Sequence, residues 1–297
     1  MKATSSARSP FPWFGGKQRM AENIIGLFPE HNVYVEVFGG GASVLLSKQP
    51  GKLDVYNDAD GGLVNFFRCL RDQPDKLVPL LELTPYAREE WERARALHDT
   101  EQDPVERARL FYVIAAGSFA GFAARDNGAA GRGWGGERLG RMHLSRAAST
   151  ANRVDHIWRF VERLRLVQID HLDWRKCLDR YDDPDCLFYL DPPYVPDTRR
   201  SGGYRHELTE DDHRELVDRV LALKGVAIIS GYSHPAYEPL VAGGFTRHEF
   251  GVWSTAARGS KGNPRDRRVE VVWTSPRASH GTLFHTTEAM ALTEDAP

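Results

Sequence analysis

The sequence lacks any apolar run long enough to cross a membrane. A spanning helix needs about 18 uninterrupted apolar residues, and the best candidate, 220–229, is broken by Lys224. The first ten residues, MKATSSARSP, also contain no apolar stretch of the kind that marks a secretory signal peptide. We therefore expect a cytoplasmic protein without a membrane partner.

Cysteine is equally scarce, with three residues, Cys69, Cys177 and Cys186, and no CxxC pair. An odd number of cysteines without such a pair excludes both a disulfide framework and a zinc knuckle. We expect reduced thiols and no bound metal.

The chain also has little net charge, since 39 basic residues against 41 acidic residues leave −2. This excludes the strong positive field of a protein that coats nucleic acid nonspecifically. The charge is uneven, however: residues 121–165 carry +5 and residues 258–277 carry +4, which leaves −11 elsewhere. Two basic segments therefore lie on an acidic body.

Short apolar runs rich in β-branched and aromatic residues predict buried strands. They are 33–38, 53–57, 166–170, 186–190, 226–230 and 269–273. Helical periodicity separates most of them, and the runs are too continuously apolar to have a solvated face. At 297 residues and 41% hydrophobic content, the chain is expected to form an α/β sheet covered by helices on both faces.

The alternation of strand and helix stops between about residues 61 and 165. Two amphipathic segments there predict helices, and a Gly- and Arg-rich stretch, 121–141, predicts a loop. We expect a discontinuous α/β domain, formed by 1–61 and 165–297, with a helical insert at 62–164.

A glycine turn follows the first predicted strand directly, at Gly39-Gly40-Gly41, and the next residues predict a helix. Glycines allow the backbone to approach a ligand closely, but the spacing fits neither a dinucleotide fingerprint nor a P-loop. Asp58 ends the second strand, where a carboxylate can accept the hydroxyls of a ribose. The alternative is that the glycines only turn the chain and Asp58 caps the next helix.

Asp191-Pro192-Pro193-Tyr194 follows the strand 186–190. Prolines have no N–H donor, so their carbonyls stay available as acceptors beside the Asp191 carboxylate. An exocyclic amino group that donates to Asp191 and to the Pro192 carbonyl becomes more nucleophilic, while Tyr194 offers a flat face for a base. The alternative is a rigid surface turn.

Together these motifs resemble the Dam-like, class I, S-adenosylmethionine-dependent DNA adenine methyltransferases. Residues 12–17, PWFGGK, are similar to the W-x-G-G-K segment of that family, and 36–41, EVFGGG, to its E-x-F-x-G-x-G turn. The resemblance spans about 11–275 and implies a Rossmann-like methyltransferase sheet with a helical target-recognition insert. Downstream, 229–234 and 267–270 occupy the places of two weaker family segments.

The resemblance implies a set of site residues. The expected S-adenosyl-L-methionine contacts are Trp13, Lys17, Glu36, Phe38, Gly39, Gly41, Asp58, Asp173 and Asp191. The expected catalytic residues are Asp191, Pro192 and Tyr194. Asp173 can instead be a helix N-cap, and the neighbouring Trp174 can form a packing wall.

The resemblance further implies double-stranded DNA as the partner. Four arginines of the insert loop are expected to contact it: Arg125, Arg132, Arg138 and Arg141. A solvated loop is the alternative for each of them. Residues 116–122 depart from the family pattern, so the resemblance implies no particular recognition sequence.

The predicted activity is methyl transfer from S-adenosyl-L-methionine to the amino group of adenine in a specific duplex sequence, after the base flips into the DPPY pocket. We expect a bacterial or phage-encoded cytoplasmic enzyme that is a monomer or weak dimer. The alternatives are the same chemistry on RNA adenine or on cytosine, and a catalytically silent DNA-binding module.

Overall fold

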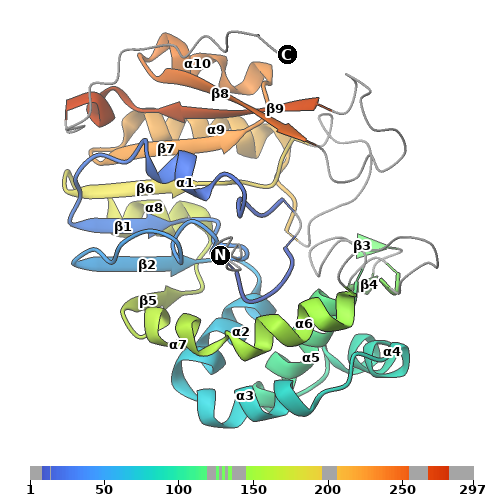
Figure 1. Cartoon of the computed structure of the whole chain (residues 1–297). Coiled ribbons are helices and arrows are strands. Elements are labelled where there is room, and N and C mark those ends of the chain that lie inside the picture. The colour runs from blue at the N-terminus through green and yellow to red at the C-terminus, as the bar shows by residue number, and fades with distance from the viewer. Residues whose placement is uncertain are drawn as a thin grey trace, which may run out of the picture.

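The computed structural model describes residues 9–13, 15–118, 125–126, 129–130, 133–135, 145–195, 206–253 and 267–280. Within these residues, seven strands form one sheet in the order β5-β2-β1-β6-β7-β9-β8 (Figure 1). The strands are β1 (Val33–Glu36), β2 (Leu53–Asn57), β5 (Val167–Asp170), β6 (Cys186–Leu190), β7 (Val226–Gly231), β8 (Thr246–Trp253) and β9 (Arg267–Thr274). The pairs from β5 to β7 are parallel, whereas β9 is antiparallel to both of its neighbours.

Helices cover both faces of this sheet. The helices are α1 (Ala21–Ile25), α2 (Gly61–Asp72), α3 (Pro74–Leu83), α4 (Arg88–Leu97), α5 (Pro104–Gly117), α6 (Arg146–Asp155), α7 (Trp158–Leu164), α8 (Trp174–Tyr181), α9 (Glu210–Ala222) and α10 (Glu238–Ala242). Successive strand residues point to opposite faces, so Tyr34 and Tyr189 join one core, and Val35 and Phe188 join the other. The predicted α/β class with a doubly covered sheet is therefore confirmed.

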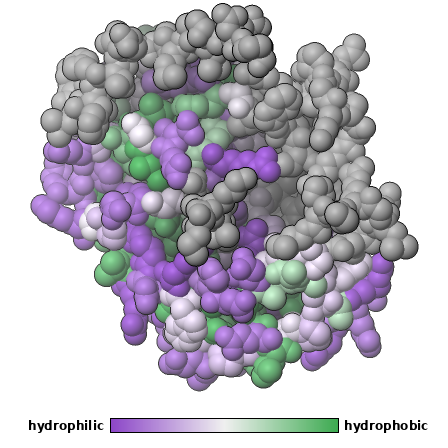
Figure 2. Space-filling model, in the orientation of Figure 1, coloured by the Kyte–Doolittle hydropathy of each residue, from purple (hydrophilic) through white to green (hydrophobic). Residues whose placement is uncertain are grey.

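The helices α2 to α7 follow β2 and precede β5, and most lie beyond the β5 edge of the sheet (Figure 1). They pack on the body through aromatic side chains, since the Phe11 ring lies 5.1 Å from Phe66 and 5.4 Å from Phe111. Hydrophilic residues dominate the described surface on the face shown in Figure 2. The apolar sides of these helices are thus turned inward, into a core shared with the sheet.

Two local predictions differ from the structure. The predicted helix after the glycines is only a run of turns over 43–47, because Pro50 and Gly51 stop the segment before it can extend. β8 was not predicted, because its sequence, TRHEFGVW, begins with four polar residues and offers no continuous apolar run. No helix in the part of the chain that the structure describes is long and apolar enough to span a bilayer.

Candidate functional site

A cavity of about 300 Å³ opens at the carboxyl ends of β1, β2 and β6. The sheet order runs outward in both directions from the β1–β6 pair, and ligands of open α/β sheets bind at such switch points. All nine predicted cofactor residues, from Trp13 to Asp191, line this cavity, and Pro192 does so too. Tyr194 is not among the described residues that line it. The tertiary structure thus gathers the predicted set, while its contact with a cofactor stays a prediction.

The glycine turn is shaped by its protein neighbours as well as by the cavity. A Cβ at Gly39 would overlap the Tyr56 ring, and one at Gly41 would lie 2.9 Å from the Trp13 Cβ. Positive φ angles occur at Gly40 (48°) and Ala42 (53°). The sequence suggested glycines here so that a ligand can approach the backbone closely. The structure shows that glycines are also needed because larger side chains would collide with Tyr56 and Trp13.

Asp58 joins the glycine turn to the end of β2. Its Oδ2 accepts a hydrogen bond from the Gly40 amide at 2.8 Å, and its Oδ1 accepts one from the Asp60 amide at 2.8 Å. Asp60, not Asp58, caps α2, by accepting from the amides of Gly62 and Leu63. Burial raises the pKa of Asp58 to about 6, although the two hydrogen bonds lower it.

Glu36 is a buried carboxyl at the end of β1. Its Oε2 accepts from the Tyr34 hydroxyl at 3.0 Å and from the Leu45 amide at 2.9 Å. Burial raises the pKa of Glu36 to about 8. Nearby, the Ser43 hydroxyl lines the cavity, is buried, and has no hydrogen-bond partner among the described residues. These groups give the cavity polar atoms that a ligand can satisfy.

Asp173 caps α8, because its Oδ1 accepts from the Arg175 amide at 2.9 Å. The helix-cap alternative is therefore confirmed, and the same residue also lines the cavity. Trp174 is buried, with its ring 6.4 Å from Phe38. Asn57 holds this segment in place by hydrogen bonds to both the amide and the carbonyl of Leu172.

The DPPY segment is anchored by a buried polar network. Lys17 Nζ donates to Asp191 Oδ1 at 2.6 Å and to the Tyr194 hydroxyl at 2.7 Å. Ser230 donates to Asp191 Oδ1 at 2.8 Å, and the Tyr194 hydroxyl donates to Glu270 Oε1 at 2.9 Å. The predicted catalytic residues Asp191 and Tyr194 are therefore joined through Lys17.

Sequence reasoning missed two members of this network, Ser230 and Glu270. Glu270 is 3% exposed although it is charged, and it lies 3.3 Å from Lys17 Nζ. A single acidic residue inside the apolar run 269–273 was the signal that could have identified it. Burial lowers the pKa of Lys17, but the carboxylates of Asp191 and Glu270 outweigh this and hold that pKa well above its usual value.

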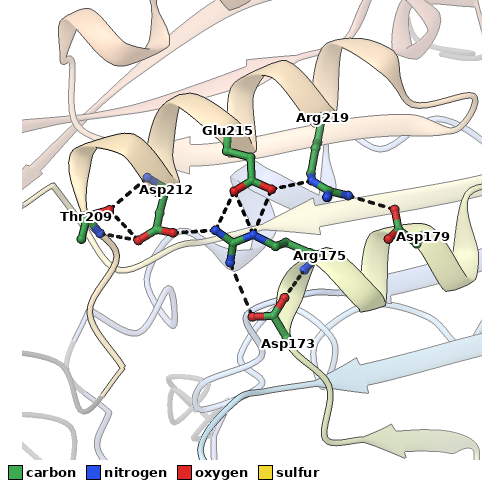
Figure 3. Close-up of polar contacts among 7 residues, drawn as sticks. All are labelled: Asp173, Arg175, Asp179, Thr209, Asp212, Glu215 and Arg219. Carbon is green, nitrogen blue, oxygen red and sulfur yellow. Dashed lines mark hydrogen bonds and ion pairs between the residues drawn. The ribbon is translucent and has the colours of Figure 1, made fainter.

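Arg175 connects α8 to α9 at the rim of the cavity (Figure 3). Its guanidinium donates to Asp212 at 2.6 Å and to both oxygens of Glu215 at 2.6 to 2.9 Å. Asp212 also forms a capping box with Thr209 at the start of α9. The rim residues 206–208 directly precede this anchored helix start.

Of the four arginines predicted to bind DNA, Arg125 lies in β3 (Arg125–Asp126), which pairs with β4 (Ala129–Ala130). Arg132, Arg138 and Arg141 lie outside the described residues. The β3–β4 pair lies on the side toward which the parallel strands point (Figure 1). Within the described ranges, no group of three or more His, Cys, Asp or Glu side chains is arranged to hold a metal ion.

The sequence matches one family of known proteins. Residues 13–233 match the family of D12 class N6 adenine-specific DNA methyltransferases. The type II methyltransferase M1.LlaDCHI of Lactococcus lactis subsp. cremoris is 28% identical over 89% of this chain and 93% of its own length. The modification methylase StsI of Streptococcus sanguinis is 26% identical over 63% of this chain, which spans 29% of that longer protein. An rRNA methylase from Streptococcus thermophilus aligns over 86% of this chain and 94% of its own, with a TM-score of 0.32 and 9% identity.

Proposed function

The chain belongs to the D12 class N6 adenine-specific DNA methyltransferase family, and on this premise we propose that it methylates the exocyclic amino group of adenine in double-stranded DNA with S-adenosyl-L-methionine. The observation that carries the proposal is the Asp191-Pro192 edge. It lies at the carboxyl end of β6, lines the cavity, and is held by Lys17 and Ser230.

The cavity offers groups suited to S-adenosyl-L-methionine. Asp58 places a carboxylate at the end of β2, where the two ribose hydroxyls can donate to it. The buried Ser43 hydroxyl without a partner and the Glu36 carboxyl supply polar atoms beside the glycine turn. Trp174 and Phe38 form an apolar wall for the adenine ring. When bound, the cofactor supplies a methyl group activated on a sulfonium.

Asp191 and Pro192 act on the target base. Both hydrogen bonds that Asp191 accepts from described residues reach Oδ1, which leaves Oδ2 free for the amino group. The amino group donates one hydrogen to Oδ2 and the other to the Pro192 carbonyl. These two bonds draw the nitrogen lone pair out of conjugation with the adenine ring, so the nitrogen becomes more nucleophilic. The Tyr194 ring, 4.5 Å from that of Tyr232, contributes an aromatic surface for the base.

The reaction itself is a direct displacement. The amino nitrogen forms a bond to the methyl carbon with its lone pair, the carbon–sulfur electron pair stays on sulfur, and the nitrogen then loses one proton to water. The adenine first has to leave the base stack, at a cost of a few kcal/mol. Positioning and the preset polar edge supply most of the acceleration.

Residues 62–164 serve, in this proposal, as the target-recognition insert of a catalytic domain formed by 1–61 and 165–297. Arg125, Arg132, Arg138 and Arg141 contact the DNA backbone. Replacing Arg132 by Ala should weaken binding to all duplexes to a similar extent. It should also reduce the slope of log affinity against log salt concentration by about one, the value for one lost phosphate contact. An unchanged salt dependence in a DNA titration would remove Arg132 from the interface.

Transfer of labelled methyl groups to duplex DNA tests the activity. Asp191→Asn preserves the shape of the side chain but removes its charge, and we expect turnover to fall about 100- to 1,000-fold. Asp211→Asn on α9, whose side chain is 91% exposed, is the matched control and should retain full activity. Full activity of Asp191→Asn would refute the assigned role. Analysis of the product nucleosides from DNA and RNA distinguishes adenine in DNA from the alternative acceptors.

A further inference from the structure

Among the described residues, the buried network at the DPPY segment contains one more carboxylate than it has cations. Lys17 Nζ lies 2.6 Å from Asp191 Oδ1 and 3.3 Å from Glu270 Oε1, and its side chain is 5% exposed. The Glu270 side chain is 4% exposed. One ammonium and two carboxylates give this group a formal charge of −1.

Glu270 comes to this position from a distant part of the chain. It lies on β9, which pairs with β7 and not with β6, and its neighbours Val271 and Val272 are fully buried. A buried carboxylate lowers stability unless it is paired. Folding alone would therefore be served as well by an apolar residue at 270 with the Lys17–Asp191 pair left intact.

We propose that Glu270 is a positioning residue of the methyl-transfer reaction, which acts by sharing the positive charge of Lys17 and by holding the Tyr194 hydroxyl. This inference rests on the function proposed above. With Asp191 as its only partner, Lys17 would neutralise the carboxylate that has to accept the amino group. With Glu270 on the ammonium as well, Asp191 keeps net negative charge toward the substrate.

The charge is needed at one stage of the reaction in particular. When the nitrogen lone pair forms the bond to the methyl carbon and the carbon–sulfur pair returns to sulfur, positive charge moves from sulfur to nitrogen. A negative Asp191 stabilises the nitrogen until it releases its proton to water. Because this stabilisation grows toward the transition state, loss of Glu270 should reduce kcat more than ground-state binding.

The Tyr194 hydroxyl is held by hydrogen bonds to both Lys17 and Glu270. It accepts from Lys17 at 2.7 Å and donates to Glu270 at 2.9 Å, so both of its hydrogen-bond roles are used inside the protein. The ring orientation beside the target base is thus set by two residues that lie more than 70 positions away in the sequence.

Glu270→Gln is the decisive variant, because it keeps the size and the acceptor for Tyr194 but removes the charge. We expect kcat to fall about 10- to 100-fold, with the dissociation constants for cofactor and duplex DNA changed less than about threefold. Glu270→Asp keeps the charge and should recover part of the lost kcat. The control is Glu249→Gln on the neighbouring strand β8, where the side chain is 51% exposed, and it should behave as wild type.

A wild-type kcat in Glu270→Gln overturns the inference, and so does an effect confined to KM, which would indicate a role in binding or folding alone. Should Glu270→Gln fail to fold, Glu270→Asp decides the matter: reduced kcat with unchanged cofactor affinity supports the inference, and unchanged kcat overturns it. Absence of DNA methylation by the wild-type protein, with cofactor still bound, would refute the proposed function itself. The two failures are therefore distinguishable.

Discussion

Ala42 carries the one positive φ angle outside glycine among the described residues, at 53°. The left-handed conformation destabilises an alanine by roughly 1–2 kcal/mol relative to its usual conformations. The turn retains it because the residues on either side are fixed: the Ala42 amide donates to the Gly39 carbonyl at 2.8 Å, and its carbonyl accepts from Leu46 at 2.9 Å. Strain of this kind is common in loops that hold a ligand.

Ala42→Gly should remove this strain. The gain is offset because glycine has more freedom in the unfolded chain and because the buried Ala42 methyl group is lost, so we expect the free energy of unfolding to change by less than about 1 kcal/mol. Urea unfolding measures the change. Ala96→Gly, at an exposed position in α4, is the control and should lower stability by about 0.5–1 kcal/mol. A loss of more than about 1 kcal/mol, as expected for an unstrained buried alanine, would show that the conformation at 42 is not strained.

Asp58 predicts a pH dependence of cofactor binding, since burial raises its pKa to about 6 in the free protein. In the proposed complex the ribose hydroxyls donate to the ionised carboxylate, which is the form present above the pKa. Affinity for S-adenosylhomocysteine, the cofactor without its methyl group, should therefore fall as the pH drops from 7 through 6, approaching tenfold per unit at about pH 5. The pKa of Glu36, about 8, lies above this window.

Calorimetric titration between pH 5 and 7 checks this expectation. Asp58→Asn cannot ionise, so it should bind more weakly at pH 7 and lose the acid dependence. The same acid dependence in wild type and Asp58→Asn would assign the titration to another group.

At the scale of elements, the contact between α8 and α9 controls the rim of the cavity. Arg175 lies on α8, whereas Asp212 and Glu215 lie one turn apart on α9 (Figure 3). A second arginine, Arg219, joins Glu215 to Asp179. Because the two helices flank the cavity, this network fixes the separation of Asp173 from the rim residues 206–208.

Arg175→Ala should loosen the rim without touching the DPPY edge. Networks of exposed ion pairs contribute modestly, so we expect KM for the cofactor to rise about two- to fivefold with kcat near that of wild type. Arg214→Ala, which breaks pairs within α9 only, is the matched control and should leave KM unchanged. Steady-state kinetics at low salt measure both variants. The same KM in Arg175→Ala and in wild type would show that the network does not contribute to cofactor binding.

At the scale of the whole molecule, the insert and the sheet share one hydrophobic core. Phe111 of α5 packs against Phe11 at 5.4 Å, Phe66 at 5.7 Å and Trp13 at 6.4 Å. Trp13 in turn lines the cavity. The helical insert is thus continuous with the wall of the candidate cofactor site.

This shared core predicts a single unfolding transition in differential scanning calorimetry. Phe111→Ala should lower stability by about 3–5 kcal/mol and move the entire transition to lower temperature. Leu83→Ala, at a side chain that is 83% exposed on α3, should have little effect. Two transitions, of which only one moves in Phe111→Ala, would mean that the insert folds independently.

Much of the fold was predictable because it depends on local pattern. Continuous apolar runs identified β1, β2, β5, β6, β7 and β9, and prolines and glycines identified the two turns that carry the site. β8 was missed because an edge strand has an exposed face and loses the continuous apolar signal. The segment after Gly41 was predicted as a helix because its composition is helical, but it begins with Ala42 in the left-handed conformation and is stopped at Pro50.

The sequence by itself determined the fold class, through the pattern of its apolar runs, and the family, through motifs of neighbouring residues whose resemblance implied ten of the residues that line the cavity. Only the tertiary structure decided which of these residues act on one another. Lys17, Asp191 and Glu270 are far apart in sequence, and their contact depends on the order of the strands in the sheet and on the path of the N-terminal segment. Strand order results from the packing of both cores at once, which no local pattern records.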